Sequence, residues 1–184
     1  MLALVAAGCG RGDRAAVHTG SPARFGFGRA ATTADVSAWD IDVTPDGTGL
    51  PPGKGTVPQG AAIYARKCAA CHGPTGTEGP SDRLVGREPR EGFPFGRDPR
   101  FVRTVGNYWP YATTLYDYVN RAMPFDKPGS LTPDEVYGLV AFLLWRNEIV
   151  ADTTVINAHT LPQVVMPAHD RFVPDNRRGG PEIH

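Results

Sequence analysis

Two cysteines and a histidine occur within five positions of this sequence. The segment reads KCAACHG, and the three residues are Cys68, Cys71 and His72. In a chain of 184 residues with three cysteines and five histidines, such a grouping calls for a chemical reason. C-x-x-C-H is the spacing at which two thiols attach a haem covalently and the adjoining imidazole binds its iron. On a helix, positions i and i+3 share a face, so both thiols can reach one edge of the haem.

Two other kinds of site also use closely spaced cysteines. A thioredoxin-like redox pair requires a βαβ setting, and the surrounding pattern does not have one. A structural zinc site requires a second ligand pair at metal spacing, which His159 and His169 do not supply. The signature therefore predicts one covalently attached haem c, with His72 as an iron ligand. The third cysteine, Cys9, lies near the N-terminus, so none is left for a disulfide.

Several side chains are candidates for the opposite side of the iron. Met123, in NRAMPFD, follows an amphipathic helical pattern and precedes a well-capped one. Met166, in VVMPAHD, has the same Met-Pro pair but lies in an irregular tail. Because a ligand loop needs a rigid scaffold, we predict Met123 as the second iron ligand, with Met166 and the histidines as alternatives. A thioether ligand raises the reduction potential, which suits an electron carrier.

Helical patterns on both sides of these ligands would position them. Residues 60–73 form a predicted helix that ends at Gly73. Residues 113–122 form another, capped by Thr114, and its apolar positions follow the i, i+3, i+4, i+7 spacing. These positions are Leu115, Tyr118, Val119 and Ala122. A shorter turn of helix with a Thr cap is expected within residues 32–41.

The last predicted helix has the strongest start signal in the chain. In LTPDEV, Thr132 is the N-cap, Pro133 the first helical residue and Glu135 the partner in a capping box. Leu131 and Val136 can form a hydrophobic staple around this start. The run VYGLVAFLLW that follows has half of the roughly 20 residues needed to cross a bilayer, so we interpret it as a core helix.

The motifs AIYARKCAACHG, GP…LVGR, RAMPF and LTPDEVYGLVAFLLW, in this order, resemble a class I c-type cytochrome over residues 58–148. The resemblance implies an all-α fold of three to four helices around a covalent haem, with the first and last helices crossing. It implies that Met123 binds the iron from the loop before the last helix. It also implies that the backbone carbonyl of Pro80 orients the imidazole of His72.

An aromatic stretch, GNYWPYATT, is the next feature to which the resemblance gives a role. In that family an aromatic residue in this region often hydrogen-bonds a haem propionate, and the candidates here are Trp109, Tyr108 and Tyr111. Packing against the haem ring is an equal alternative for them. Arg100 and Arg103 are also near, and we interpret them as solvated side chains.

A longer resemblance covers nearly the whole chain. FGFGRAATTADVSAWDIDVTPDGTGLPPGKG, TVGNYWPYATTLYDYVNRAMPFDKPG and LPQVVMPAHDRFVPD are similar to the monohaem cytochrome subunits of molybdenum enzymes of sulfur oxidation, the sulfite and sulfane dehydrogenases. This implies a molybdenum-containing partner subunit and a downstream acceptor cytochrome. One alternative is an independent lipid-anchored electron shuttle between a respiratory complex and a terminal oxidase. Another is a haem that binds small ligands, which requires that Met123 does not bind the iron.

These patterns divide the chain into four segments. They are a signal-like segment at 1–9, an extended N-terminal arm at 10–57, a cytochrome c domain at 58–148 and an extended C-terminal arm at 149–184. MLALVAAGC resembles the end of a bacterial lipoprotein signal, although it lacks a basic region and its apolar run is short. We therefore expect a periplasmic, exported protein with a membrane tether through Cys9.

Charge and composition exclude other classes of protein. Acidic and basic side chains number 19 each, so the chain lacks the basic footprint of a nucleic-acid binder. The 22 glycines and 18 prolines have no period, which argues against a repeat protein and predicts long irregular connections. No arrangement of paired carboxylates or Ser, His and Asp stands out, and an iron with two axial protein ligands has no open position for substrate. We therefore do not expect this chain to be an enzyme by itself.

Overall fold

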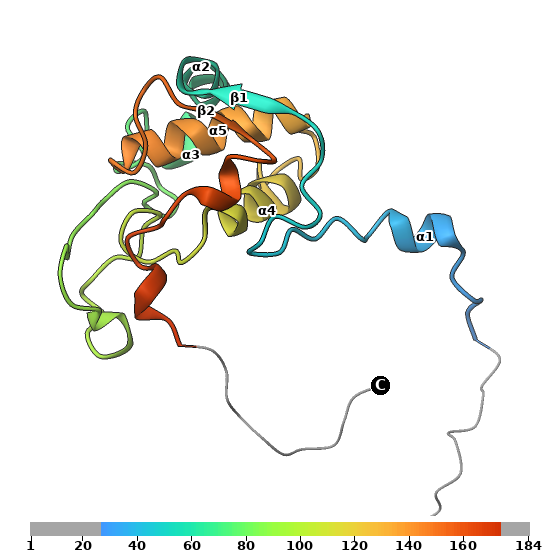
Figure 1. Ribbon diagram of the computed structural model, residues 1–184, viewed down its shortest axis with the longest axis horizontal. Helices are drawn as coiled ribbons and strands as arrows, with labels where there is room; N and C mark the ends of the chain where they lie inside the picture. The colour runs from blue at the N-terminus through green and yellow to red at the C-terminus, as the bar shows by residue number, and fades with distance from the viewer. Residues whose placement is uncertain (1–26, 174–184) are drawn as a thin grey trace, which may run out of the picture.

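Most of the regular structure is helical in the computed structural model, which describes residues 27–173 (Figure 1). The helices are α1 (Thr33–Ser37), α2 (Val57–Lys67), α3 (Ala69–His72), η1 (Pro94–Gly96), α4 (Ala112–Ala122), α5 (Pro133–Arg146), η2 (Leu161–Gln163) and η3 (His169–Arg171). Two short strands, β1 (Lys54–Thr56) and β2 (Val155–Asn157), pair antiparallel. The signal-like segment with Cys9 and the outer parts of both arms lie outside the described residues.

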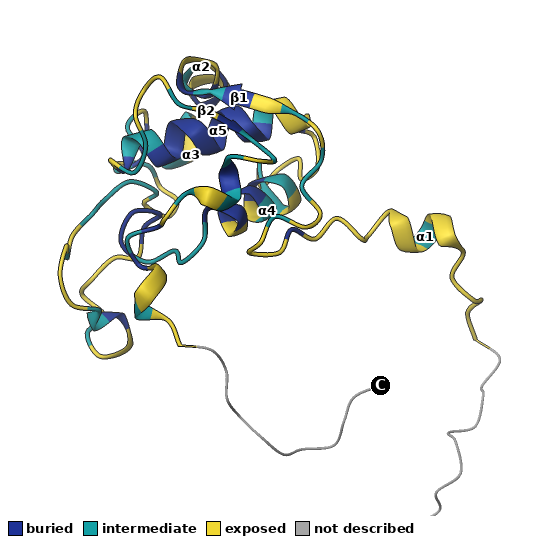
Figure 2. Cartoon of the chain, in the orientation of Figure 1, coloured by how far each residue is buried: buried dark blue, intermediate teal, exposed yellow. Residues whose placement is uncertain are grey.

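Helix α5 forms the centre of the fold. Its predicted capping box is present, because Thr132 Oγ1 accepts a hydrogen bond from the backbone N–H of Glu135 while the Glu135 carboxylate accepts one from the N–H of Thr132. Leu131 and Val136 are both buried, as a hydrophobic staple requires. Every residue from 136 to 144 is buried, and Figure 2 shows this helix enclosed by its neighbours.

Helix α2 crosses α5 at a contact between two glycines. A Cβ atom placed on Gly60 would lie 1.8 Å from the carbonyl oxygen of Gly138, so only a residue without a side chain fits there. Strand β1 meets the same point of α5, since a Cβ on Gly55 would lie 2.0 Å from the Gly138 nitrogen. The predicted crossing of the first and last helices of the cytochrome-like region is therefore close backbone-to-backbone packing.

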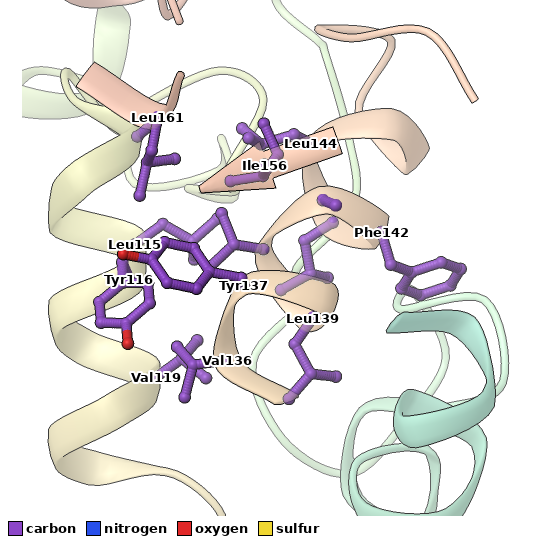
Figure 3. Close-up of a cluster of buried hydrophobic side chains, with 14 of the residues drawn as sticks. Leu115, Tyr116, Val119, Val136, Tyr137, Leu139, Phe142, Leu144, Ile156 and Leu161 are labelled. Atoms are coloured by element: carbon purple, nitrogen blue, oxygen red, sulfur yellow. The ribbon is translucent and has the colours of Figure 1, made fainter. Parts of the chain in front are cut away.

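Helix α4 packs against another side of α5, and Leu115 and Val119 of its predicted apolar face are buried there. Tyr116 is fully buried and lies against Tyr137 of α5, with ring centroids 4.6 Å apart (Figure 3). The predicted core residue Tyr118 is instead 48% exposed. Because aromatic side chains bury large apolar areas, this contact favours the rotation of the helix that encloses Tyr116.

The start of α4 also differs from the prediction. The N-cap is Tyr111, which makes no side-chain capping bond, and Thr114 lies inside the first turn. The Thr113 hydroxyl in this first turn donates to the backbone carbonyl of Pro45. Asp117 accepts from the backbone N–H of Val43, which ties the N-terminal segment to this helix.

Both flanking segments partly cover the helices. The hydroxyl of Tyr137 donates to the carbonyl of Pro51, and β1 pairs with β2 through Gly55 and Ile156. Ile156, Leu161 and Met166 of the C-terminal segment are buried in the core. The domain boundaries given above remain predictions.

Helix α1 differs from the rest of the described chain. Its capping box between Thr32 and Asp35 is formed, as the Thr cap predicted, but it has no buried residue. In Figures 1 and 2 it stands away from the helical core. No helix within residues 27–173 is long and apolar enough to cross a membrane.

Candidate haem-binding site

The two cysteines lie where α2 meets α3. Cys68 interrupts the helix expected over residues 60–73, and its carbonyl oxygen accepts hydrogen bonds from the N–H groups of both Cys71 and His72. These three residues therefore form one tight helical turn. The thiols of Cys68 and Cys71 are both free, the first partly buried against the core and the second exposed.

The chemical environment of the thiols favours haem attachment over a thioredoxin-like redox pair or a structural zinc site. Burial raises the pKa of the Cys68 thiol to about 11, so at neutral pH it is not the thiolate that a reactive redox pair uses. Within residues 27–173, no group of three or more His, Cys, Asp or Glu side chains is arranged to hold a metal ion. A four-ligand zinc site accordingly has no support in the described part of the chain.

The imidazole of His72 is held by a backbone carbonyl. Its Nδ1 lies 2.8 Å from the carbonyl oxygen of Asp82. A carbonyl oxygen can only accept, so Nδ1 must carry the proton and Nε2 has a free lone pair. This is the arrangement of a histidine prepared to bind a metal through Nε2, with its ring orientation fixed from behind.

The acceptor was expected to be Pro80, and this expectation is corrected. The turn after the histidine folds back closely, because Ser81 donates from its backbone N–H to the Cys71 carbonyl at 2.9 Å. A Cβ on Gly79 would lie 2.1 Å from that same carbonyl oxygen. With residues 79–81 packed on Cys71, the chain reaches the imidazole only at Asp82.

Met123 is placed at the end of α4, at the start of the connection to α5. It is the C-cap residue, its N–H donates to the carbonyl of Val119, and its side chain is half-buried against the core. Met166 is 2% exposed and fills the core itself. Met166 is thus packed within the core, whereas Met123 begins the loop before α5. Met123 as the second iron ligand remains a prediction.

The three aromatic candidates for a propionate contact pack against different neighbours in the structure. Trp109 packs partly against the core and meets Tyr118 edge to face at 5.6 Å. Tyr108 belongs to an aromatic cluster with Phe93, Phe95 and Phe172. Tyr111 meets the ring of His169. The role of Trp109 stays a prediction.

Arg100 is solvated, whereas Arg103 contacts two neighbouring aromatic residues. Arg100 is an exposed side chain paired with Asp98. Arg103 donates to the carbonyl of Phe95, and its guanidinium lies 4.8 Å from the centre of the Tyr108 ring. The other two histidines within residues 27–173, His159 and His169, are exposed, as expected of surface residues.

A cavity of about 490 Å³ adjoins the carbonyl-bearing residue Asp82. Its other lining residues come from the segment 95–103 and are both apolar, such as Phe101, and basic, such as Arg97. None of Cys68, Cys71, His72 and Met123 lines this cavity. The fit to a haem c rests instead on the two free thiols and on an imidazole whose Nε2 is available.

The sequence did not point to Asp82 as the acceptor for His72. Asp82 contributes only its backbone carbonyl, for which no residue type is diagnostic.

Comparisons with known proteins agree with this geometry. Residues 55–143 match the family model described as cytochrome C oxidase, cbb3-type, subunit III. A chain of the crystal structure of the sulfane dehydrogenase SoxCD from Paracoccus pantotrophus is 42% identical in sequence, with a TM-score of 0.71. That match covers 84% of this chain and 74% of the other. No curated protein sequence matches.

Proposed function

This chain belongs to the c-type cytochromes, and from that premise we propose that it is the electron-transfer haem subunit of a molybdenum-containing sulfite or sulfane dehydrogenase. The observation that carries the proposal is the extent of the match to a chain of a sulfane dehydrogenase. It covers 84% of this chain, whereas the family model covers only residues 55–143. The likeness therefore extends into the flanking segments, which a cytochrome c domain alone does not need.

The described residues have distinct tasks in this proposal. Cys68 and Cys71 would attach the haem, and His72 and Met123 would bind its iron. A bound haem supplies a one-electron couple. The protein would hold the haem in place, supply the ligands that set its reduction potential and limit the access of water to it. Trp109 is proposed to contact a propionate or to pack against the ring.

The N-terminal segment supports a protein partner. Phe27, Val36 and Trp39 are 92%, 54% and 84% exposed, and α1 has no buried residue. A five-residue helix is marginal in water without packing, even with its capping box. An exposed tryptophan in the turn just after such a helix is a typical anchor for another protein. We propose that the molybdenum subunit covers it.

The onward path and the location of the protein complete the proposal. Electrons leave to a soluble acceptor cytochrome, the chain is exported to the periplasm, and Cys9 tethers it to a membrane. These parts rest on the resemblance and on the N-terminal sequence MLALVAAGC. Because both axial positions of the iron are taken, the substrate is oxidised on the partner subunit and not on this chain.

A second function has one observation in its favour. The family model that matches residues 55–143 is named for a subunit of an oxidase, which suits an independent shuttle between a respiratory complex and a terminal oxidase. This match stops at the cytochrome c domain and leaves both flanking segments without a role, so we rank the shuttle second.

The test is substrate-dependent reduction of the haem in protein purified natively from its own membranes. Sulfite or thiosulfate is added, the visible haem bands are followed, and molybdenum is assayed in the same sample. Rapid reduction with one molybdenum per haem is the expected result. A molybdenum-free preparation that neither substrate reduces would rule out the dehydrogenase and leave the shuttle.

A further inference from the structure

Three buried polar side chains converge on one short stretch of backbone. Within residues 27–173, the buried polar residues are Thr104, Asn107, Thr113 and Asn147. All of them except Thr113 hydrogen-bond to the backbone of residues 84–88, and we call these three side chains the polar clamp. Buried polar side chains cost stability unless they are satisfied, so three of them on five residues mark a segment whose position matters.

Asn147, at the C-terminal end of α5, makes the most complete set of these bonds. Its Oδ1 accepts from the N–H of Gly86 at 2.9 Å, and its Nδ2 donates to the carbonyl of Leu84 at 3.3 Å. The same Nδ2 donates to the carbonyl of Leu143 at 2.8 Å, which anchors the side chain to its own helix. A Cβ on Gly106 would lie 2.5 Å from this Oδ1, so the amide can occupy this place only because residue 106 has no side chain.

The other two members of the polar clamp, Thr104 and Asn107, bond to the same segment. Thr104 Oγ1 donates to the carbonyl of Gly86 at 2.6 Å. Asn107 Nδ2 donates to the carbonyl of Glu88 at 2.5 Å, and its Oδ1 accepts from the N–H of Thr104 at 2.8 Å. Residues 84–88 are therefore fixed by side chains from two separate parts of the chain.

The same segment is tied to the turn that follows the haem-attachment motif. The N–H groups of Leu84 and Val85 both donate to the carbonyl of Gly76, at 2.9 and 3.1 Å. Asp82, whose carbonyl accepts from His72 Nδ1, lies two residues before Leu84. The carbonyl behind the imidazole thus belongs to a stretch with little freedom to move.

We propose that Asn147 and Thr104 are positioning residues that set the orientation and basicity of the His72 imidazole through the carbonyl of Asp82. This rests on the proposed function, in which His72 binds the haem iron. A strong hydrogen bond to Nδ1 makes Nε2 a better donor and favours the oxidised iron. The Asp82 residue is exposed, so its carbonyl is placed by the backbone on either side of it, which the polar clamp holds from the side of Leu84 and Gly86.

The proposal is tested on the full-length, haem-loaded protein with the variants Asn147→Ala and Thr104→Val. Thr113→Val is the matched control, because Thr113 is equally buried but donates to Pro45 in the N-terminal segment. The readouts are urea unfolding, the reduction potential and the hyperfine-shifted proton resonances of the axial histidine. All three variants should lose stability, and only the first two should shift the histidine resonances.

At a fixed ambient potential, Asn147→Ala should raise the ratio of reduced to oxidised protein about tenfold, about 59 mV for a one-electron couple. Thr104→Val should shift the reduction potential in the same direction by a smaller amount. If Asn147→Ala does not take up haem, the potential of Thr104→Val tests the proposal. Unchanged potentials and histidine resonances in both variants would overturn the proposal, as would an equal shift in Thr113→Val. Failure of the wild-type protein to bind haem covalently would instead refute the proposed function.

Discussion

Gly60 of α2 and Gly138 of α5 meet so closely that a Cβ on Gly60 would lie 1.8 Å from the Gly138 carbonyl oxygen. The contact is between backbones, so no rotamer change can relieve it. It sets the angle and depth at which α2 crosses α5, and α2 leads directly to Cys68. The geometry of the haem-attachment turn therefore depends on this crossing.

Replacing Gly60 by alanine should destabilise the haem-loaded protein by about 3 kcal/mol, the upper end of the usual overpacking cost. Gly138→Ala should cost less, because its Cβ would lie 3.2 Å from the Gly60 nitrogen and alanine is the better helix former. Gly96→Ala, where nothing lies within 4 Å, should change stability by no more than about 0.5 kcal/mol. Urea unfolding gives all three values. Equal effects at Gly60 and Gly96 would contradict the close crossing.

Both cysteines of the α2–α3 junction should be needed for a haem that survives denaturation. In the double variant Cys68→Ala with Cys71→Ala, the denatured chain should have the mass of the polypeptide alone. The wild-type chain should have the mass of the polypeptide plus one haem. Cys9→Ser should retain the haem, because it lies outside the attachment motif. A double variant that keeps its haem through denaturation would show that the attachment is elsewhere.

Met123→Leu should remove the weak far-red band of a methionine–iron bond, lower the reduction potential and allow carbon monoxide to bind at neutral pH. Met166→Leu should keep the band and the potential and cost less than about 1.5 kcal/mol, because it is a volume-conserving change in the core. Visible spectra and redox titration of both variants will show which methionine binds the iron. The reverse pattern would make Met166 the ligand, and an unchanged spectrum in both would point to a histidine.

Trp39→Ala should weaken binding to the molybdenum subunit about 30-fold, or about 2 kcal/mol, the loss expected for an anchoring aromatic residue. Phe125→Ala is the matched control, since Phe125 is 85% exposed and Trp39 is 84% exposed. Phe125 follows Met123 in the loop before α5, far along the chain from α1. Surface plasmon resonance with the purified partner measures both affinities. If the two variants bind as tightly as wild type, α1 does not hold the partner.

Features governed by local rules could be predicted from the sequence. The capping box of Thr132 and Glu135 and the Thr32 cap of α1 both follow from side chains within one helical turn, and both are present. The start of α2 was placed too late, at residue 60, although Thr56 and Gln59 form the same kind of signal. Reading that capping box would have placed the start correctly.

Features that depend on distant partners could not be predicted. The contact between Tyr116 and Tyr137, which are 21 positions apart, favours the rotation of α4 that encloses Tyr116, whereas helical periodicity alone predicted Tyr118 in the core. The acceptor for His72 is a backbone atom of Asp82, and its place depends on bonds from Asn147. A backbone carbonyl acceptor cannot be recognised from the sequence, because every residue has one.

Acid should loosen the turn after His72 through Glu78. A hydrogen bond from the Thr75 hydroxyl, and then one from the Thr77 backbone N–H, lower the pKa of the Glu78 carboxyl from 4.5 to about 2. Because the folded pKa lies below the unfolded value, the stabilisation is fully present above about pH 4.5 and is lost as the pH falls towards 2.

Glu78→Gln keeps the shape of the side chain without its charge, so the variant should be less stable than wild type at pH 6 and nearly equal to it at pH 2. Thermal unfolding followed by circular dichroism between pH 2 and pH 6 measures the difference. Every other titrating group is shared by the two proteins, so its effect cancels in the comparison. Glu91→Gln, in another loop, is the control and should follow wild type throughout. A gap between Glu78→Gln and wild type that stays constant over this range would mean that the charge of Glu78 does not hold the turn.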